Sequence, residues 1–161
     1  MKRILNLDEL EFQAQSHGES FEARGVNVSA DLGAVKLGYG VTCVPAGKRA
    51  WPFHNHRANE ELFFVLSGTG QYRIGDDSHP IRAGDFIAAP AGDRSSAHQI
   101  VNDSDAELRY IAVSTQIRPE IVEYPDSGKF SASAGAIAGE DDFRHVGRKS
   151  DSVDYWLDED R

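Results

Sequence analysis

The sequence predicts an all-β fold built as a sandwich or a barrel, and three observations support this prediction. Short runs rich in Val, Ile, Phe and Tyr recur through the middle of the chain, Gly, Pro, Asp and Asn separate them, and few long stretches there have a helical period. Strands at regular spacing with turn residues between them are typical of sandwiches and barrels. The clearest predicted strands are LGYGVTCV (37–44), ELFFVL (61–66), GQYRI (70–74), DFIAAP (85–90), HQIVN (98–102) and ELRYIAVST (107–115).

Two connections between these runs have the composition of hairpin turns. SGTG, at 67–70, separates ELFFVL from QYRI, and Gly-Asp-Asp, at 75–77, separates GQYRI from the segment SHPI. Gly and Asp readily adopt the backbone angles that tight turns require. We therefore expect antiparallel neighbours on either side of each turn.

The chain of 161 residues suits one domain with extensions at both ends. We expect an N-terminal extension over 1–34, which adds an edge strand or crosses the barrel, a barrel core over 35–115 and a C-terminal extension over 116–161. Within the last, the small residues of SASAGAIAGEDD, at 131–142, favour a flexible connection over a core element. Tyr155 and Trp156 are unusual in a solvated tail, so we expect them to dock on the barrel or on a second subunit.

Composition excludes several classes of partner and location. With 17 basic and 26 acidic residues the formal charge is -9, so no extended basic stripe for nucleic acid is expected. No secretory signal and no apolar run of the ~20 residues that span a bilayer are present, which predicts a soluble cytoplasmic protein without a membrane partner. The single cysteine, Cys43, fits a reducing compartment, and its apolar run GVTCV makes it a core residue rather than a nucleophile.

A cluster of possible metal ligands lies in FHNHRANEELFFVLSG, at 53–68. Residues i and i+2 of a strand share one face, so His54 and His56 can present two imidazoles side by side. Glu61 follows a predicted turn and can return a carboxylate to the same ion, while its neighbour Glu60 faces the other way. Phe63 shares the strand parity of Glu61, which makes it a pocket-lining candidate.

A second segment, GDFIAAPAGDRSSAHQIVN at 84–102, adds His98, and the two segments together resemble the paired motifs of the cupin superfamily. The residues at the positions of the first motif are Gly47, His54, His56, Glu61 and Gly68. Those at the positions of the second are Gly84, Pro90, Gly92, His98 and Asn102. The separations before His54 and before His98 are longer than is usual in the family, and both insertions fall in predicted loops, where they are tolerated. The resemblance covers about 35–115, and YPDSGK, at 124–129, looks like the extension of a subgroup of small bacterial cupins.

This resemblance implies a cupin jelly-roll barrel that holds one divalent metal ion. The implied ligands are His54, His56, Glu61 and His98, whereas His17, His79 and His145 have no partner at ligand spacing and are expected at the surface. A set of three imidazoles and one carboxylate accepts Mn, Fe, Co, Ni, Cu or Zn, so the metal stays open.

Two classes of function remain open for such a protein. Cupins include dioxygenases, sugar isomerases and epimerases, and decarboxylases, so the resemblance implies a metal-dependent enzyme, such as an oxygenase or isomerase, that acts on a small polar metabolite. The alternative is a non-catalytic module that binds or senses a sugar or a small acid. The sequence identifies no catalytic residue beyond the ligands. Because exposed sheet edges need covering, we also expect a homodimer.

Overall fold

A computed structural model describes residues 2–135 and 142–160. In this part of the chain, thirteen strands and three short 3₁₀ helices are present, and α-helix is absent. The strands are β1 (Gln13–His17), β2 (Phe21–Asn27), β3 (Leu37–Val44), β4 (Asn55–His56), β5 (Glu61–Ser67), β6 (Thr69–Ile74), β7 (Asp77–Arg82), β8 (Phe86–Ala89), β9 (His98–Val101), β10 (Leu108–Thr115), β11 (Glu120–Tyr124), β12 (Lys129–Ala134) and β13 (Phe143–Arg148). The 3₁₀ helices are η1 (Leu7–Glu9), η2 (Arg94–Ser96) and η3 (Lys149–Asp151). The prediction of an all-β fold is confirmed.

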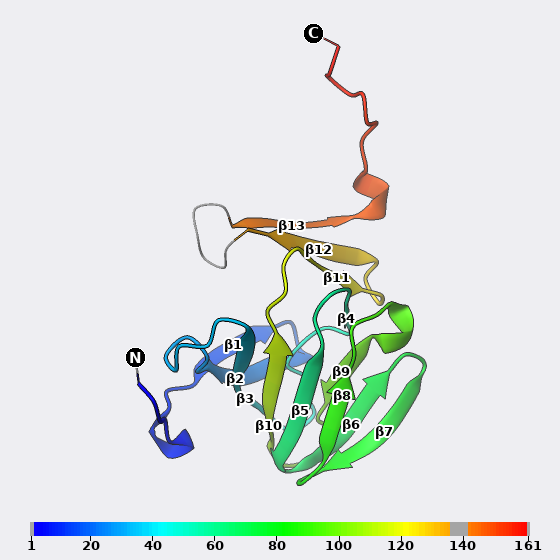
Figure 1. Cartoon of the computed structure of the whole chain (residues 1–161). Helices are drawn as coiled ribbons and strands as arrows, with labels where there is room; N and C mark the ends of the chain where they lie inside the picture. Colours follow the sequence, from blue (N-terminus) through cyan, green and yellow to red (C-terminus); the bar gives the residue numbers. More distant parts are fainter. Residues whose placement is uncertain (1, 136–141, 161) are drawn as a thin grey trace.

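The strands form a two-layered barrel with a further sheet at one end (Figure 1). One layer has six strands in the order β1-β2-β3-β10-β5-β8, and the other has three in the order β7-β6-β9. The further sheet has the order β13-β12-β11-β4, and its last strand, β4, belongs to the segment that contains the predicted ligands His54 and His56. The C-terminal extension therefore reaches the predicted metal site through β11, which pairs with β4.

Alternating side chains of the barrel strands fill its interior. Val44, Val65 and Leu108 have no exposed surface, and Phe63 and Tyr110 pack edge to face with ring centroids 5.7 Å apart. This alternation is what the period of two in the predicted strands requires. Cys43 is buried at 1% exposure, which confirms it as a core residue.

The structure corrects the prediction for the first of the two hairpins. β6 and β7 pair with Ile74 opposite Asp77, so the Gly-Asp turn between them is the predicted hairpin. The strands on either side of SGTG, in contrast, lie in different layers, because β5 pairs with β8 and β10 while β6 pairs with β7 and β9. Gly68 makes the change of layer with a φ of +86°, at a point where a Cβ would lie 2.5 Å from the Glu107 carbonyl oxygen. Only glycine fits both conditions.

The flanks contain more strand than their composition predicts. β1 and β2 extend the edge of the six-stranded layer, in line with the expected edge strand. The expected flexible connection at 131–142 is wrong for 131–134, which belong to β12, and 136–141 lie outside the described residues. β12 is a central strand whose backbone bonds to β11 and β13, so pairing on both sides outweighs the low strand preference of its small side chains.

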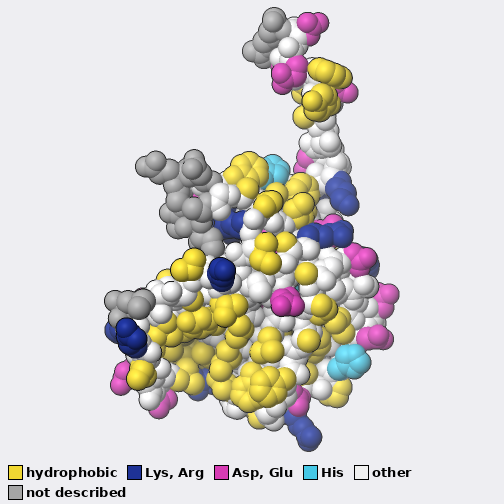
Figure 2. Space-filling model, in the orientation of Figure 1, with side chains coloured by type: hydrophobic (Ala, Val, Ile, Leu, Met, Phe, Trp, Pro, Cys, Tyr) yellow, Lys and Arg dark blue, Asp and Glu magenta, His cyan; other side chains and the backbone are white. Residues whose placement is uncertain are grey.

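The outer face of the six-stranded layer is apolar, as Figure 2 shows for the region over β10, β5 and β8. Leu62 is 40% exposed there and Phe86 74%. Tyr155 and Trp156 are 84% and 72% exposed and contact each other edge to face, so the expected docking on the barrel does not occur. Their docking on a second subunit, and the homodimer itself, stay predictions.

Candidate metal centre

Backbone pairing brings the two histidine segments together. The His54 amide donates to the His98 carbonyl at 3.1 Å, and the His98 amide donates to the His54 carbonyl at 2.7 Å. Residues paired in this way across two antiparallel segments project their side chains to the same side. His54 and His98, far apart in the sequence, therefore meet with ring centroids 4.7 Å apart.

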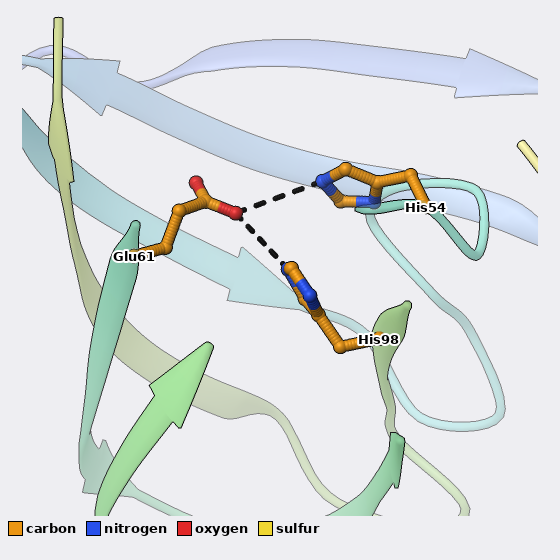
Figure 3. Close-up of side chains that lie close together, drawn as sticks. All are labelled: His54, Glu61 and His98. Atoms are coloured by element: carbon orange, nitrogen blue, oxygen red, sulfur yellow. Dashed lines mark hydrogen bonds and ion pairs between the residues drawn. The ribbon is translucent and has the colours of Figure 1, made fainter. Parts of the chain in front are cut away.

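The three predicted histidine ligands converge on one carboxylate oxygen of the fourth ligand, Glu61 (Figure 3, which draws His54, Glu61 and His98). Glu61, at the start of β5, places Oε2 3.0 Å from the Nε2 of His98 and 3.3 Å from that of His56. The Nε2 of His54 lies 3.7 Å from the same oxygen. Ligand atoms of His54, Glu61 and His98 all lie within 4.8 Å of one another, and His56 contacts Glu61 from outside this compact group. Glu60 is exposed, as expected.

In two of the rings, the contact of Nδ1 determines which nitrogen can bind a metal when the ring is neutral. The Nδ1 of His54 lies 2.8 Å from the Pro52 carbonyl oxygen, and that of His98 lies 3.2 Å from the Ser96 carbonyl oxygen. A carbonyl oxygen only accepts, so each Nδ1 carries the proton and donates, and in the neutral ring Nε2 is left with a lone pair. This tautomer is the one that a metal ligand requires.

Charge is concentrated in the centre. Burial acts to raise the pKa of the Glu61 carboxyl, but hydrogen bonds from the three imidazoles outweigh burial and hold that pKa well below its usual range. For His56, burial acts to lower the pKa, whereas the carboxylates of Glu61 and Glu120 outweigh burial and raise it above the usual value. Three imidazole nitrogens around one carboxylate oxygen are a donor set that suits a divalent transition metal and leaves coordination positions open.

A cavity of about 480 Å³ reaches Glu61 from the six-stranded layer. Its polar lining includes Thr42, Ser114 and Gln116, and glycines of β2 and β3 leave room between them. Phe63, the predicted pocket-lining residue, is instead buried at 5% exposure and packs against the ring of His98, with centroids 5.7 Å apart. It supports a ligand and does not line this cavity.

Sequence reasoning missed Glu120, a buried carboxylate at the start of β11. Its Oε2 lies 3.5 Å from the Nδ1 of His56, on the side of the ring that faces away from Glu61. No spacing rule connects Glu120 to the two motifs, because β11 reaches β4 only through tertiary pairing. The remaining histidines, His17, His79 and His145, are exposed, as expected.

A histidine and carboxylate centre lies inside a two-layered barrel, and comparison with known proteins finds a family that this part of the chain resembles. Residues 40–114 match the cupin domain. An oxalate-binding protein from Thermotoga maritima is 30% identical over 60 residues, 37% of this chain and 47% of that protein, so the chain spans about half the length of this curated relative.

Solved structures support the fold over a longer stretch. A candidate sugar phosphate isomerase from Acidithiobacillus ferrooxidans superposes with a TM-score of 0.80 at 23% identity, over 94% of this chain and 96% of that one. A sugar phosphate isomerase from Silicibacter pomeroyi superposes with a TM-score of 0.78 at 23% identity, over 92% and 94%. The chain therefore shares the fold of these structures, the cupin jelly roll, as the two motifs predicted, and residues 40–114 are the part that matches the cupin domain. None of the helices among the described residues is long and apolar enough to span a membrane.

Proposed function

We propose that this protein is a metal-dependent enzyme that acts on a small polar metabolite, with one divalent ion held by His54, His56, Glu61 and His98. The observation that carries the proposal is the convergence of three imidazole nitrogens on one Glu61 oxygen, at 3.0, 3.3 and 3.7 Å, at the wall of an open cavity. Such an ion supplies Lewis acidity toward a carbonyl or hydroxyl oxygen or, as Fe(II), redox chemistry with dioxygen.

The cavity supports the class of ligand. At about 480 Å³ it is in the size range of small-molecule sites. The hydroxyls of Thr42 and Ser114 and the amide of Gln116 offer hydrogen bonds, and none of the described residues that line the cavity is Lys or Arg. This lining suits a metabolite rich in hydroxyl and carbonyl groups. Isomerases, epimerases and oxygenases all act on such substrates. The two structural relatives described above are both named as sugar phosphate isomerases.

The alternative function is binding or sensing without turnover. Apart from Glu61, Tyr39 is the titratable side chain among the described residues that line the cavity, so this lining offers few groups for proton transfer. The curated relative is also named as a binding protein. Both observations favour the alternative.

Metal reconstitution tests both functions. Parent protein loaded separately with Mn, Fe, Co, Ni, Cu or Zn is incubated with a pool of polar metabolites, and oxygen uptake and product masses are followed. We expect turnover with at least one metal in the parent and in His79→Ala, which alters an exposed histidine, and its loss in His56→Ala. A ligand retained unchanged with every metal would favour the binding module. Equal metal content in His56→Ala and the parent would reject the site.

A further inference from the structure

We infer that Glu120, which lies outside the matched cupin domain, is a positioning residue of the metal centre that holds both His56 and the loop from His56 to Glu61 in place. This inference rests on the proposed metal binding. Its basis is the set of hydrogen bonds that one buried carboxylate, 6% exposed, accepts from the loop at 57–59.

Both oxygens of the carboxylate are used. Oε1 accepts from the backbone amides of Arg57 at 3.0 Å and Ala58 at 3.1 Å, and also from the amide of Ile121 at 2.8 Å. Oε2 accepts from the backbone amide of Asn59 at 2.9 Å and from its side-chain amide. The amides of Ala58 and Asn59 thus have Glu120 in place of a strand partner, and the Arg57 amide shares its donation between Glu120 and the Ile121 carbonyl oxygen, at 2.9 Å.

The loop is short, so its shape determines where its two ends lie. His56 precedes it and Glu61 follows it, and both present ligand atoms to the centre. Asn59 adds a second attachment, because its Oδ1 accepts from the Thr115 hydroxyl at 2.9 Å and from the Ile117 amide at 2.6 Å. The end of β10 and the start of β11 therefore hold the loop together. A shift of the loop would move a ligand at each end.

Glu120 also lies against a ligand ring. Its Oε2 is 3.5 Å from the Nδ1 of His56, a separation at which the structure has no hydrogen bond. A carboxylate on this side favours the tautomer that carries its proton on Nδ1, which leaves the Nε2 lone pair on the side of Glu61. For His54 and His98, backbone carbonyls have this role, and for His56 Glu120 occupies the equivalent place.

A second carboxylate on the same strand provides the matched control. Glu123 is hydrogen bonded to the side-chain amide of Asn55 at 3.0 Å and pairs with the Arg57 guanidinium at 2.8 Å. It accepts none of the three loop amides, which all donate to Glu120. Glu120→Gln and Glu123→Gln therefore remove one charge each from neighbouring places. Only the first alters the acceptor of the loop amides, whereas the second removes the partner of the Arg57 side chain.

The test compares metal affinity with stability. Metal-free parent, Glu120→Gln, Glu120→Ala and Glu123→Gln are titrated with Co²⁺ while its visible absorption is recorded, and the Tm of each metal-free protein is measured. We expect Co²⁺ affinity to fall roughly 10- to 100-fold in both Glu120 variants, the usual effect of losing a group that orients a ligand, with an altered absorption envelope. Glu123→Gln should bind as the parent does.

Each other outcome overturns the inference. A lower Tm in the Glu120 variants with unchanged Co²⁺ affinity would show a structural role only. If both Glu120 variants fail to fold, Asn59→Ala, which leaves the carboxylate and the backbone amides in place, decides: we expect a smaller loss of affinity, and no loss rejects the inference. A parent that takes up no Co²⁺ overturns the proposed function as well, whereas equal affinities in a parent that binds Co²⁺ overturn the inference alone.

Discussion

The two ends of the barrel interior differ although the same strands build both. Along β5, inward side chains run from Val65 to Glu61, and along β10 they run from Leu108 to Ser114. β3 shows the same change along its length, because Val44 lies opposite Leu108 and Gly38 lies opposite Ser114. We call the part around Val44, Val65 and Leu108 the apolar end, and the part around Glu61, Ser114 and the histidines the polar end.

The difference shows how the barrel separates stability from function. Side chains of the apolar end are fully buried, and each contributes about 1.5–3 kcal/mol by leaving water. The polar end instead holds an ionised carboxylate, three imidazoles and the cavity of about 480 Å³. Burying charge there is costly unless it is paired, so the apolar end must supply the stability that the polar end lacks.

The largest effect on folding is expected at the apolar end. Leu108→Ala removes a side chain with no exposed surface and leaves a cavity, which should lower the free energy of unfolding by about 2–5 kcal/mol. Urea unfolding of the metal-free protein measures this. Leu62→Ala, at a leucine 40% exposed on the outer face, is the control and should cost far less. Equal losses in the two variants would contradict the division between the ends.

A substitution at the polar end should change the metal affinity more than the free energy of unfolding. Glu61→Gln keeps the shape of the side chain and removes the charge on which three histidines converge. We expect metal affinity to fall by more than the roughly 10- to 100-fold that orienting groups supply, and the free energy of unfolding to change less than in Leu108→Ala. Competitive dialysis against a chelator measures the affinity. Glu60→Gln, at the exposed neighbour, should bind metal as the parent does. An equal loss of metal affinity in Glu60→Gln would contradict the assignment of Glu61 as a ligand.

The sequence predicted the barrel strands because these depend on local order, and the resemblance to the two cupin motifs implied the four side chains that meet at the centre. Alternation places Glu61 and Phe63 on one face of β5, and the two motifs place His54 and His98 at the start of paired segments. The change of layer at Gly68 was not predicted, since the same Ser-Gly pattern also suits a hairpin. The strand β12 and the role of Glu120 were not predicted for a related reason. Each depends on partners that are distant in the sequence, and the sequence alone does not locate these partners.

The smallest effect is expected where the polar end meets the C-terminal sheet. Arg73 of β6 donates two hydrogen bonds, at 2.7 and 2.9 Å, to Asp126 in the turn after β11, and it lies 3.6 Å from the ring centroid of Phe53, next to His54. The hydrogen bonds from Arg73 lower the pKa of Asp126, and the pair is half-exposed. Asp126→Asn should therefore lower the free energy of unfolding at neutral pH by at most about 1 kcal/mol.

The direction of its pH dependence follows from the lowered pKa. A carboxyl whose pKa is lower in the folded protein than in the unfolded chain, where it is about 3.9, stabilises the fold above that value, and its contribution is lost as the pH falls through the folded pKa. The difference in Tm between the parent and Asp126→Asn should therefore be present at neutral pH and fade on acidification. Asp105→Asn, at an exposed aspartate in the loop between β9 and β10, controls for net charge. A difference that grows as the pH falls would mean that Asp126 does not join the barrel to the C-terminal sheet as a charged partner of Arg73.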